Sequence, residues 1–219
     1  IKNVALEDID ITGRNYTGGL VGIAKNSTTL VGITKSSTTI TNSYATGSVT
    51  GSSYTGGLVG RVINSIILNS YATGSVTGTG DYTGGLAGTV QTSSTITNSY
   101  ATGSVSGTGE FTGGLVGEAS YSSILNSYAT GKVTGGNYTG GLAGTVQTSS
   151  TITNSYATGK VTGGNYTGGL VGVAGSPRST VTNSYWDTET TGQSRSAEGE
   201  GKTNEEMKTA DTYSAWDTD

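Results

Sequence analysis

Apolar residues recur along the chain at a short interval and at a long one. At the short interval they alternate with polar residues, as in the stretch 45–50 (ATGSVT), where Ala, Gly and Val fall on one side. Alternation with a period of two is typical of a half-buried strand rather than a helix. Later copies place Lys132 and Lys160 at the position of Ser48, so we expect the polar side to face water.

The long interval is a repeat of 27 to 29 residues that carries two motifs. Asn-Ser-Tyr begins at residues 42, 69, 98, 126, 154 and 183, and Asn3 fits the same frame. The motif [Tyr/Phe]-Thr-Gly-Gly-Leu-[Val/Ala]-Gly begins at residues 16, 54, 82, 111, 138 and 166. Disordered chains do not hold apolar positions in register over seven copies. The repeat therefore predicts a folded solenoid.

About 28 residues with three short strands match one coil of a parallel β-helix. We therefore predict an all-β parallel β-helix, or β-solenoid, of six to seven coils, right-handed because parallel crossovers usually are. Residues 1–192 are expected to form the solenoid, and an internal duplication at 23–39 is expected to protrude from the first coil as a hairpin. Residues 193–219 are expected to form an acidic cap. Thr203 and Glu206 form a capping-box pattern that predicts a short helix over 204–212.

Two repeated positions are expected to shape the coil. Alternation places Tyr54, Leu58 and Val62 on one side, so the aromatic ring of the second motif is expected to be buried. The repeated Asn is expected to form a structural ladder at a turn, its amide bonding backbone groups of neighbouring rungs. This ladder comprises Asn3, Asn42, Asn69, Asn98, Asn126, Asn154 and Asn183.

Composition narrows the chemistry. The 219 residues include 38 Gly but no Cys and no His, which excludes thiol nucleophiles, zinc–cysteine sites and Ser-His-Asp triads. The net charge of −4 argues against a nucleic-acid partner, and no apolar run is long enough for a membrane span. We therefore expect no catalytic residue, no metal and no cofactor. Of the 15 acidic residues, 9 follow Trp186, so a nearly neutral rod is expected to end in an acidic cap.

The two motifs also carry a family resemblance. Gly-Gly-Leu-Val-Gly at Gly18, Gly56, Gly113 and Gly168, together with Asn-Ser-Tyr-Ala-Thr-Gly-[Ser/Lys]-Val, resembles the GLUG repeat. The closing stretch from Tyr185-Trp186-Asp187 to Trp216-Asp217 resembles the usual end of such arrays. The resemblance implies a large secreted or surface-anchored microbial protein, similar to filamentous-haemagglutinin-like adhesins and to regions that precede IgA-specific metallopeptidases. It also implies that this chain is one segment of a longer exported protein.

Outward threonines form two candidate binding faces. The first follows the third strand of each coil and comprises Thr39, Thr41, Thr95, Thr97, Thr151, Thr153, Thr180 and Thr182. The second comprises Thr46, Thr50, Thr73, Thr77, Thr102, Thr130, Thr134, Thr158 and Thr162. A flat Thr array is what ice binding requires, although Thr also suits exposed strands by propensity alone. Ile66, Leu68 and Leu125 interrupt the first face, and Lys132 and Lys160 the second.

Aromatic and acidic positions give two further candidates. A line of tyrosines from Tyr44 to Tyr185 is either a structural rib or a surface on which sugar rings stack. Asp81 and Glu110 occupy equivalent positions in adjacent repeats, about 5 Å apart if the rungs stack, which is near a retaining glycosidase's carboxylate separation. Other copies have Asn or Ser there, which indicates a polar turn position.

The sequence thus favours a non-enzymatic, extracellular β-helix segment of a microbial surface adhesin, serving as a stalk or as a repetitive ligand-presenting surface. Its partner would be a glycan, a host or matrix protein, or ice. The alternatives are an ice-binding protein that uses the Thr ladders and a polysaccharide-binding or polysaccharide-cleaving β-helix. Self-association into filaments through the first rung or the side ladders is a further expectation, and the expected location is secreted or cell-surface.

Overall fold

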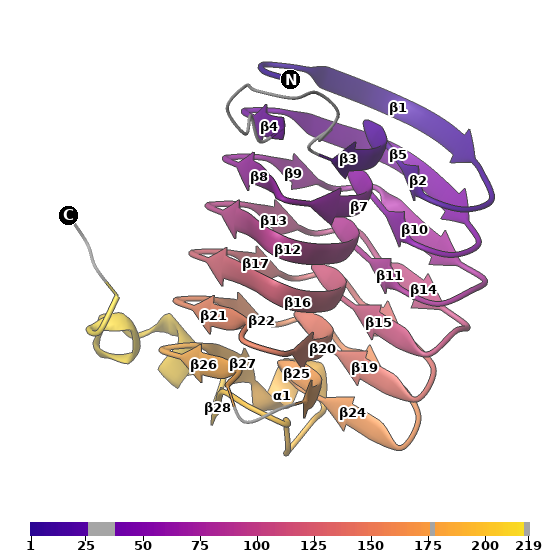
Figure 1. Cartoon of the computed structure of the whole chain (residues 1–219). Coiled ribbons are helices and arrows are strands. Elements are labelled where there is room, and N and C mark those ends of the chain that lie inside the picture. The colour runs from indigo at the N-terminus through magenta and orange to yellow at the C-terminus, as the bar shows by residue number, and fades with distance from the viewer. Residues whose placement is uncertain (26–37, 176–177, 217–219) are drawn as a thin grey trace.

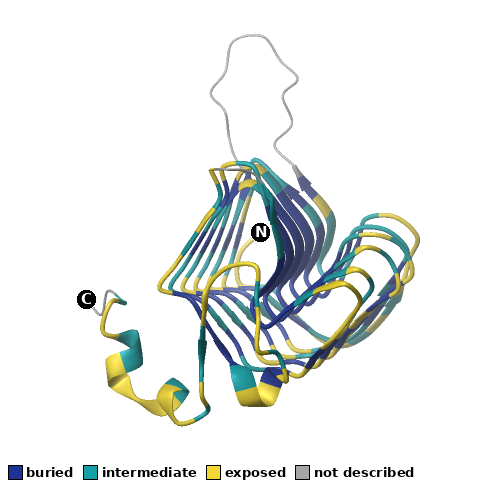
Figure 2. Ribbon diagram, turned by 90° about the horizontal axis from the view of Figure 1, so that it is seen from below, coloured by how far each residue is buried: buried dark blue, intermediate teal, exposed yellow. Residues whose placement is uncertain are grey.

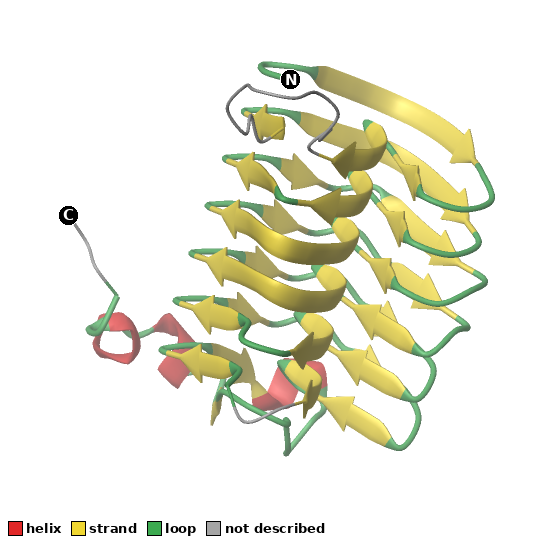
Figure 3. Ribbon diagram, in the orientation of Figure 1, coloured by secondary structure: helices red, strands yellow, loops and turns green. Residues whose placement is uncertain are grey.

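Stacked coils of parallel strands make up the molecule (Figures 1 and 3). The computed structural model describes residues 1–25, 38–175 and 178–216, and in these residues the strands form three sheets. Sheet 1 has 12 strands, sheet 2 has six and sheet 3 has ten. The six strands of sheet 2 delimit five complete turns of about 28 residues, with incomplete turns at both ends. The all-β parallel solenoid predicted from the repeat is confirmed.

The strands are short and recur at fixed places in the repeat. Sheet 1 comprises β1 (Ala5–Thr12), β5 (Tyr44–Gly51), β9 (Tyr71–Ala72), β10 (Ser75–Gly78), β13 (Tyr100–Ala101), β14 (Val105–Gly107), β17 (Tyr128–Ala129), β18 (Val133–Thr134), β22 (Tyr156–Ala157), β23 (Val161–Thr162), β27 (Tyr185–Asp187) and β28 (Glu200–Lys202). Sheet 2 comprises β2 (Thr17–Gly18), β6 (Thr55–Gly56), β11 (Thr83–Gly84), β15 (Phe111–Gly113), β19 (Tyr138–Gly140) and β24 (Tyr166–Gly168). Sheet 3 comprises β3 (Val21–Lys25), β4 (Thr38–Thr41), β7 (Val59–Ile63), β8 (Ser65–Leu68), β12 (Ala87–Thr97), β16 (Val116–Leu125), β20 (Ala143–Gln147), β21 (Thr151–Thr153), β25 (Val171–Gly175) and β26 (Thr180–Thr182).

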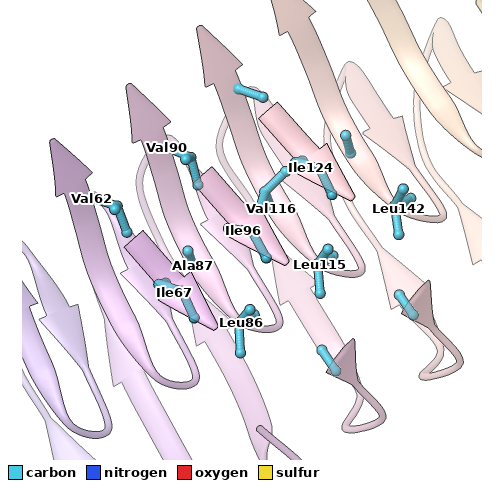
Figure 4. Packing of buried hydrophobic residues seen from close by; sticks show 14 of the residues in the cluster. Val62, Ile67, Leu86, Ala87, Val90, Ile96, Leu115, Val116, Ile124 and Leu142 are labelled. Carbon is cyan, nitrogen blue, oxygen red and sulfur yellow. The ribbon is translucent and has the colours of Figure 1, made fainter. Parts of the chain in front are cut away.

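The core is a set of columns, each made of one apolar position of the repeat. Leu86, Leu115 and Leu142 follow one another in successive coils and are fully buried, and Ile96 pairs in register with Ile124 (Figure 4). Seen along the axis, the coils superimpose closely, with buried residues inside and exposed turns at the edges (Figure 2). Identical neighbours fill each layer, so the core reaches close packing without any long apolar segment.

A sharp corner separates sheet 3 from sheet 1, and the repeated Asn forms it. All seven asparagines adopt a left-handed backbone, with φ between 47° and 55°. The amide of Asn98 donates to Asn69 Oδ1, and that of Asn126 to Asn98 Oδ1, each over 3.2 Å. Each of these amides thus bonds the amide of the equivalent Asn in the neighbouring coil, whereas the sequence predicted bonds to backbone groups. Asn suits the corner because it tolerates this backbone and bonds its own kind.

The serine that follows each Asn forms a buried ladder that the sequence did not indicate. Ser70 Oγ accepts from the backbone N–H of Ser43 over 3.2 Å and donates to the carbonyl of Leu68 over 2.9 Å. The same pair of bonds recurs at Ser99, Ser127, Ser155 and Ser184. Each hydroxyl therefore meets both its donor and its acceptor needs inside the wall.

The Gly-Gly pair is required by close approach of the backbone rather than by its dihedral angles. A Cβ on Gly85 would lie 2.1 Å from the carbonyl oxygen of Gly114, its equivalent in the next coil. Any side chain here would push two coils apart. The pair thereby allows the chain to bend between sheets 2 and 3 at full coil spacing.

The C-terminal end of the rod is closed by a broken repeat. Trp186 stands in register with Ala157 and is buried, so one large ring fills the last layer. Ser196 Oγ accepts from the backbone N–H of Val171 over 2.8 Å, and β28 pairs with β27. Residues 195–202 thus cover strand edges that would otherwise be open. The described residues contain no helix with the length and hydropathy of a membrane span.

One local prediction differs from the structure, one helix was not predicted, and one predicted feature lies outside the described residues. Residues 204–212 do not form a continuous helix but two 3₁₀ turns, η1 (Glu206–Lys208) and η2 (Ala210–Tyr213). A short helix, α1 (Thr188–Thr191), begins instead after Asp187, whose carboxylate accepts from the backbone N–H groups of Glu189 and Thr190, both over 2.9 Å. The tip of the predicted hairpin, 26–37, lies outside the described residues.

The Asn corner gives a mutational test. Asn98→Ala loses the ladder bonds and also forces a Cβ residue into the left-handed region, whereas Asn98→Gly loses only the bonds. We expect Asn98→Ala to be less stable than Asn98→Gly by about 1 kcal/mol in urea unfolding.

The control is the same pair of substitutions at Ser104, which is exposed and lacks a positive φ. There the order should reverse, because Gly has the greater unfolded-state entropy. Equal stability of the two Asn98 variants would contradict the backbone explanation.

Candidate functional site

The outer side of sheet 1 presents four parallel columns of side chains. Along β5 the residues Tyr44, Thr46, Ser48 and Thr50 are partly exposed, while Ala45 between them is buried. Each coil repeats this pattern in register, because Tyr44 pairs with Tyr71 and Thr50 with Thr77. We call this surface the sheet 1 face.

The first column of the sheet 1 face is a ladder of stacked rings, the tyrosine ladder, comprising Tyr44, Tyr71, Tyr100, Tyr128 and Tyr156. Successive ring centroids lie 4.7–4.9 Å apart with interplanar angles of 3–8°. Each inner ring has both faces covered by its neighbours, so only edges and hydroxyls reach the surface. A sugar ring can therefore stack on an aromatic face only at an end of the ladder. The stacking favours the structural-rib interpretation for the inner rungs.

The second candidate Thr face lies on this same surface. Thr50, Thr77, Ser106, Thr134 and Thr162 follow one another in register. Thr46, Thr73, Thr102, Thr130 and Thr158 form the column next to the tyrosines, where each backbone N–H from Thr73 onward donates to the preceding coil over 3.1 Å. Exposed Lys132 and Lys160 stand between the two columns, in place of the serines of earlier coils.

The first candidate Thr face follows the outer side of β4, β8, β12, β16, β21 and β26. Thr39 and Thr95 both pair with Ile66, Thr41 and Thr97 both pair with Leu68, and Leu125 separates Thr97 from Thr153. Thr151 pairs with Thr180 and Thr153 with Thr182, so Thr-x-Thr occupies adjacent rungs at that end. The structure thus brings the eight residues into two columns, and branched apolar side chains divide those columns.

A second aromatic column, made of the first residue of the Gly-Gly motif, corrects a prediction. Tyr54, Tyr82 and Phe111 are half-buried and stack 4.9–5.1 Å apart outside the core, although the sequence placed them inside with Leu58. The Gly-Gly bend turns the chain between ring and leucine, so the period of two does not carry across it. The column lies over the outer side of sheet 3, since the Arg61 guanidinium sits 5.2 Å from the Tyr54 ring centroid.

Beneath this column runs a polar network that crosses three coils. Arg61 donates to Gln91 Oε1 over 2.7 Å, and Gln91 in turn bonds Glu118. Burial raises the pKa of Glu118, while Gln91 and Arg61 partly offset that effect. The network has no opening that would admit a reactant, because Glu118 is only 8% exposed and stands in register between buried Thr89 and Thr145.

The candidate acids lie in the same exposed turn of adjacent coils. Asp81 and Glu110 are both exposed, and Asp81 Oδ1 accepts from the backbone N–H of Glu110 over 3.2 Å. Such a bond is typical of a polar turn repeated in successive coils. Over the described residues, His, Cys, Asp and Glu side chains do not gather in any group of three that could hold a metal ion.

The geometry defines a class of protein, a parallel β-solenoid whose wall repeats one coil sequence. The family described as the GLUG motif matches residues 51–77, 79–106, 112–134 and 135–162. The chain thus carries GLUG repeats, as its two motifs predicted. Among solved structures it is similar to a Bacteroides ovatus protein with the provisional name immunoglobulin A1 protease, at a TM-score of 0.62 and 22% identity over 99% of this chain and 70% of that one. At this identity the likeness shows the fold alone. No curated protein has significant sequence similarity to the chain.

Burial within the two stacked aromatic columns also changes the pKa of tyrosine hydroxyls. Burial raises the pKa of Tyr156 to about 12, and Tyr128 and Tyr213 beside it add to the shift. Burial likewise raises the pKa of Tyr82 to about 12, with Glu118 as the next cause. Both phenols therefore remain hydrogen-bond donors well above the pH at which an exposed tyrosine ionises.

These shifts predict a loss of stability in alkali. Above the unfolded pKa of 10.0 the unfolded chain has released phenolic protons that the folded chain still holds, so stability falls as pH rises towards 12. We expect the urea midpoint to be steady up to about pH 9 and to fall beyond pH 10. Tyr156→Phe should make that fall shallower, whereas Tyr121→Phe, at an exposed ring, should not. Identical pH profiles for the two variants would contradict the prediction.

Proposed function

We propose that the chain is a non-enzymatic segment of a larger exported microbial surface protein, and that it acts both as a stalk and as a repetitive ligand-presenting surface. The observation that carries the proposal is the sheet 1 face, where identical side chains recur in register over successive coils. Parallel coils fix each part of this surface relative to the next, so the rod is stiff along its length.

The mechanism is additive contact along the rod. One coil offers a Tyr edge, two Thr hydroxyls and a Ser or Lys, which is a small and weak set of contacts. A ligand that repeats at the coil spacing would meet several such sets at once, and linked weak contacts give strong overall binding. An extended glycan or a fibrous matrix protein has a repeat of this kind. The same regularity disfavours catalysis, which needs one unique constellation of groups.

The exported location is supported by the repeat family and by the similar structure. The Bacteroides ovatus protein is named after immunoglobulin A1, which occurs outside cells. Few charges and many hydroxyls also suit a surface that presents hydrogen-bond donors and acceptors over a long distance.

The ligand-presenting role predicts a face-specific loss of binding. Thr102→Trp places a bulky ring in the middle of the sheet 1 face, and Ser123→Trp places the same ring on the outer side of sheet 3. We expect binding to glycan arrays, whole cells or immobilised matrix proteins to fall at least tenfold with Thr102→Trp only. Equal loss with both variants, or no binding by the unmodified chain to any of these targets, would contradict ligand presentation.

Ice binding is the second candidate, favoured by the unbroken Thr column from Thr46 to Thr158 on the sheet 1 face. The ladder spacing of about 4.8 Å makes this column regular. If the column binds ice, the protein should produce thermal hysteresis and shape ice crystals. Thr102→Tyr should abolish the effect, while Thr97→Tyr on the divided first face should retain most of it. Unmodified crystal growth at high protein concentration would reject this candidate.

A further inference from the structure

A pocket of about 310 Å³ lies where the tyrosine ladder meets the C-terminal segment. Its walls come from β22, from the start of α1 and from the 3₁₀ turns that lie beside the last coils (Figure 1). The lining includes Tyr156, Thr158, Asp187, Asn204, Lys208 and Tyr213. This volume is at the small end of the range for ligand pockets, which fits one compact unit rather than an extended chain.

The C-terminal segment is held at this place by specific contacts. Trp216 Nε1 donates to the carbonyl of Asn183 over 2.8 Å, and the Asn183 amide donates to the carbonyl of Ala215 over 3.2 Å. The Trp216 ring lies 6.3 Å from the rings of both Tyr156 and Tyr185, and Tyr213 meets it edge-on at 4.7 Å. These contacts hold Tyr213, which lines the pocket, against the last coils of the rod.

The one carboxylate in the pocket lining, that of Asp187, accepts hydrogen bonds from the protein itself. Asp187 Oδ1 accepts from the backbone N–H groups of Glu189 and Thr190, and Oδ2 accepts from Asn204 Nδ2 over 2.8 Å. Burial opposes its ionisation, but the hydrogen bonds from Thr190, Asn204 and Glu189 outweigh burial and lower the pKa of Asp187. The ionised Asp187 thus balances the positive charge of Lys208, and the pocket lining is neutral as a whole. The oxygens of Asp187 accept their hydrogen bonds from the protein itself.

Three donors remain for a ligand. Lys208 bonds Asn204 Oδ1, and it has no carboxylate within ion-pair distance among the described residues. Nothing in the described part of the chain bonds the hydroxyls of Tyr156 and Thr158. Beside these donors stand the rings of Tyr156 and Tyr213 and the thioether of Met207. Tyr156 is also the last rung of the ladder, and the next ring beyond it is that of Trp216, whose centroid lies 6.3 Å away.

We infer that this pocket binds one neutral hexose unit of a glycan. The aromatic and thioether wall takes the apolar C–H face of the sugar, and the Lys208 ammonium and the two hydroxyls donate to its oxygens. A neutral lining disfavours an anionic sugar, whose carboxylate would meet the charge of Asp187. The inference rests on the proposed ligand-presenting function and deepens it, because it assigns the specific contact to the end of the ladder and the repeated weak contacts to its length.

The test uses the full chain and four methyl glycosides, those of glucose, galactose, mannose and glucuronic acid. Saturation-transfer NMR and tryptophan emission should detect millimolar binding of at least one neutral glycoside, since Trp216 packs against Tyr213. Thr158→Val and Lys208→Met each remove one donor at nearly constant shape and should weaken binding about tenfold. Thr130→Val, the same ladder position one coil away, should leave binding unchanged.

Three results would overturn the inference. These are no binding of any neutral glycoside, preferential binding of methyl glucuronide, or equal affinity of the unmodified chain, Thr158→Val and Lys208→Met. Far-ultraviolet circular dichroism and the urea midpoint of each variant separate a lost contact from a lost fold. If no neutral glycoside binds but the chain still binds cells or matrix proteins through the sheet 1 face, the pocket assignment fails and the proposed function stands. Glycoside binding together with undiminished binding of Thr102→Trp to cells and matrix proteins would retain the pocket assignment and contradict ligand presentation by the sheet 1 face.

Discussion

The structure depends on the parallel hydrogen-bond ladder, because that ladder fixes the distance from each coil to the next. Neighbouring strands lie about 4.8 Å apart, and the tyrosine rings repeat at 4.7–4.9 Å because their backbones do. Each side chain consequently meets its own equivalent above and below. A residue that packs well against itself therefore serves every coil, whereas charged residues that repel their own copies, such as Lys132 and Lys160, are found at exposed positions.

This constraint explains the chemistry of the wall better than composition alone does. A hydroxyl or an amide both donates and accepts, so each buried serine can bond the backbone of its own and the neighbouring coil, and Asn98 can bond the equivalent Asn on both sides. A carboxylate only accepts when ionised and repels its copy. The buried acid Glu118 accordingly has Thr89 and Thr145 in register on either side rather than other acids. Charge is scarce, at 12% of the residues, because a stacked wall has few places for it.

The same constraint decides how far the sequence predicts the structure. Repeat period, strand positions and the register of both Thr faces are recoverable from sequence, since identical residues must align. The Tyr54 column was placed wrongly because alternation holds only within a strand, and the Gly-Gly bend interrupts it. Residues 188–191 align with a strand but form α1, because Asp187 caps a helix there. The pocket at Tyr156 depends on how the non-repeating C-terminal segment folds back, and no periodicity predicts that.

Repetition and specificity are thus placed in different parts of the molecule. A wall of equal coils can only offer equal contacts, whose strength comes from their number. A unique arrangement requires a break in the repeat, and the break comes where Trp186 replaces the small core residue and the chain leaves the coil path. There the ladder ends, Trp216 takes the place of the next tyrosine, and residues from outside the repeat add the Lys208 ammonium and the Tyr213 ring to the pocket. A ligand that is recognised specifically should therefore contact this junction, even if most of its binding energy comes from the wall.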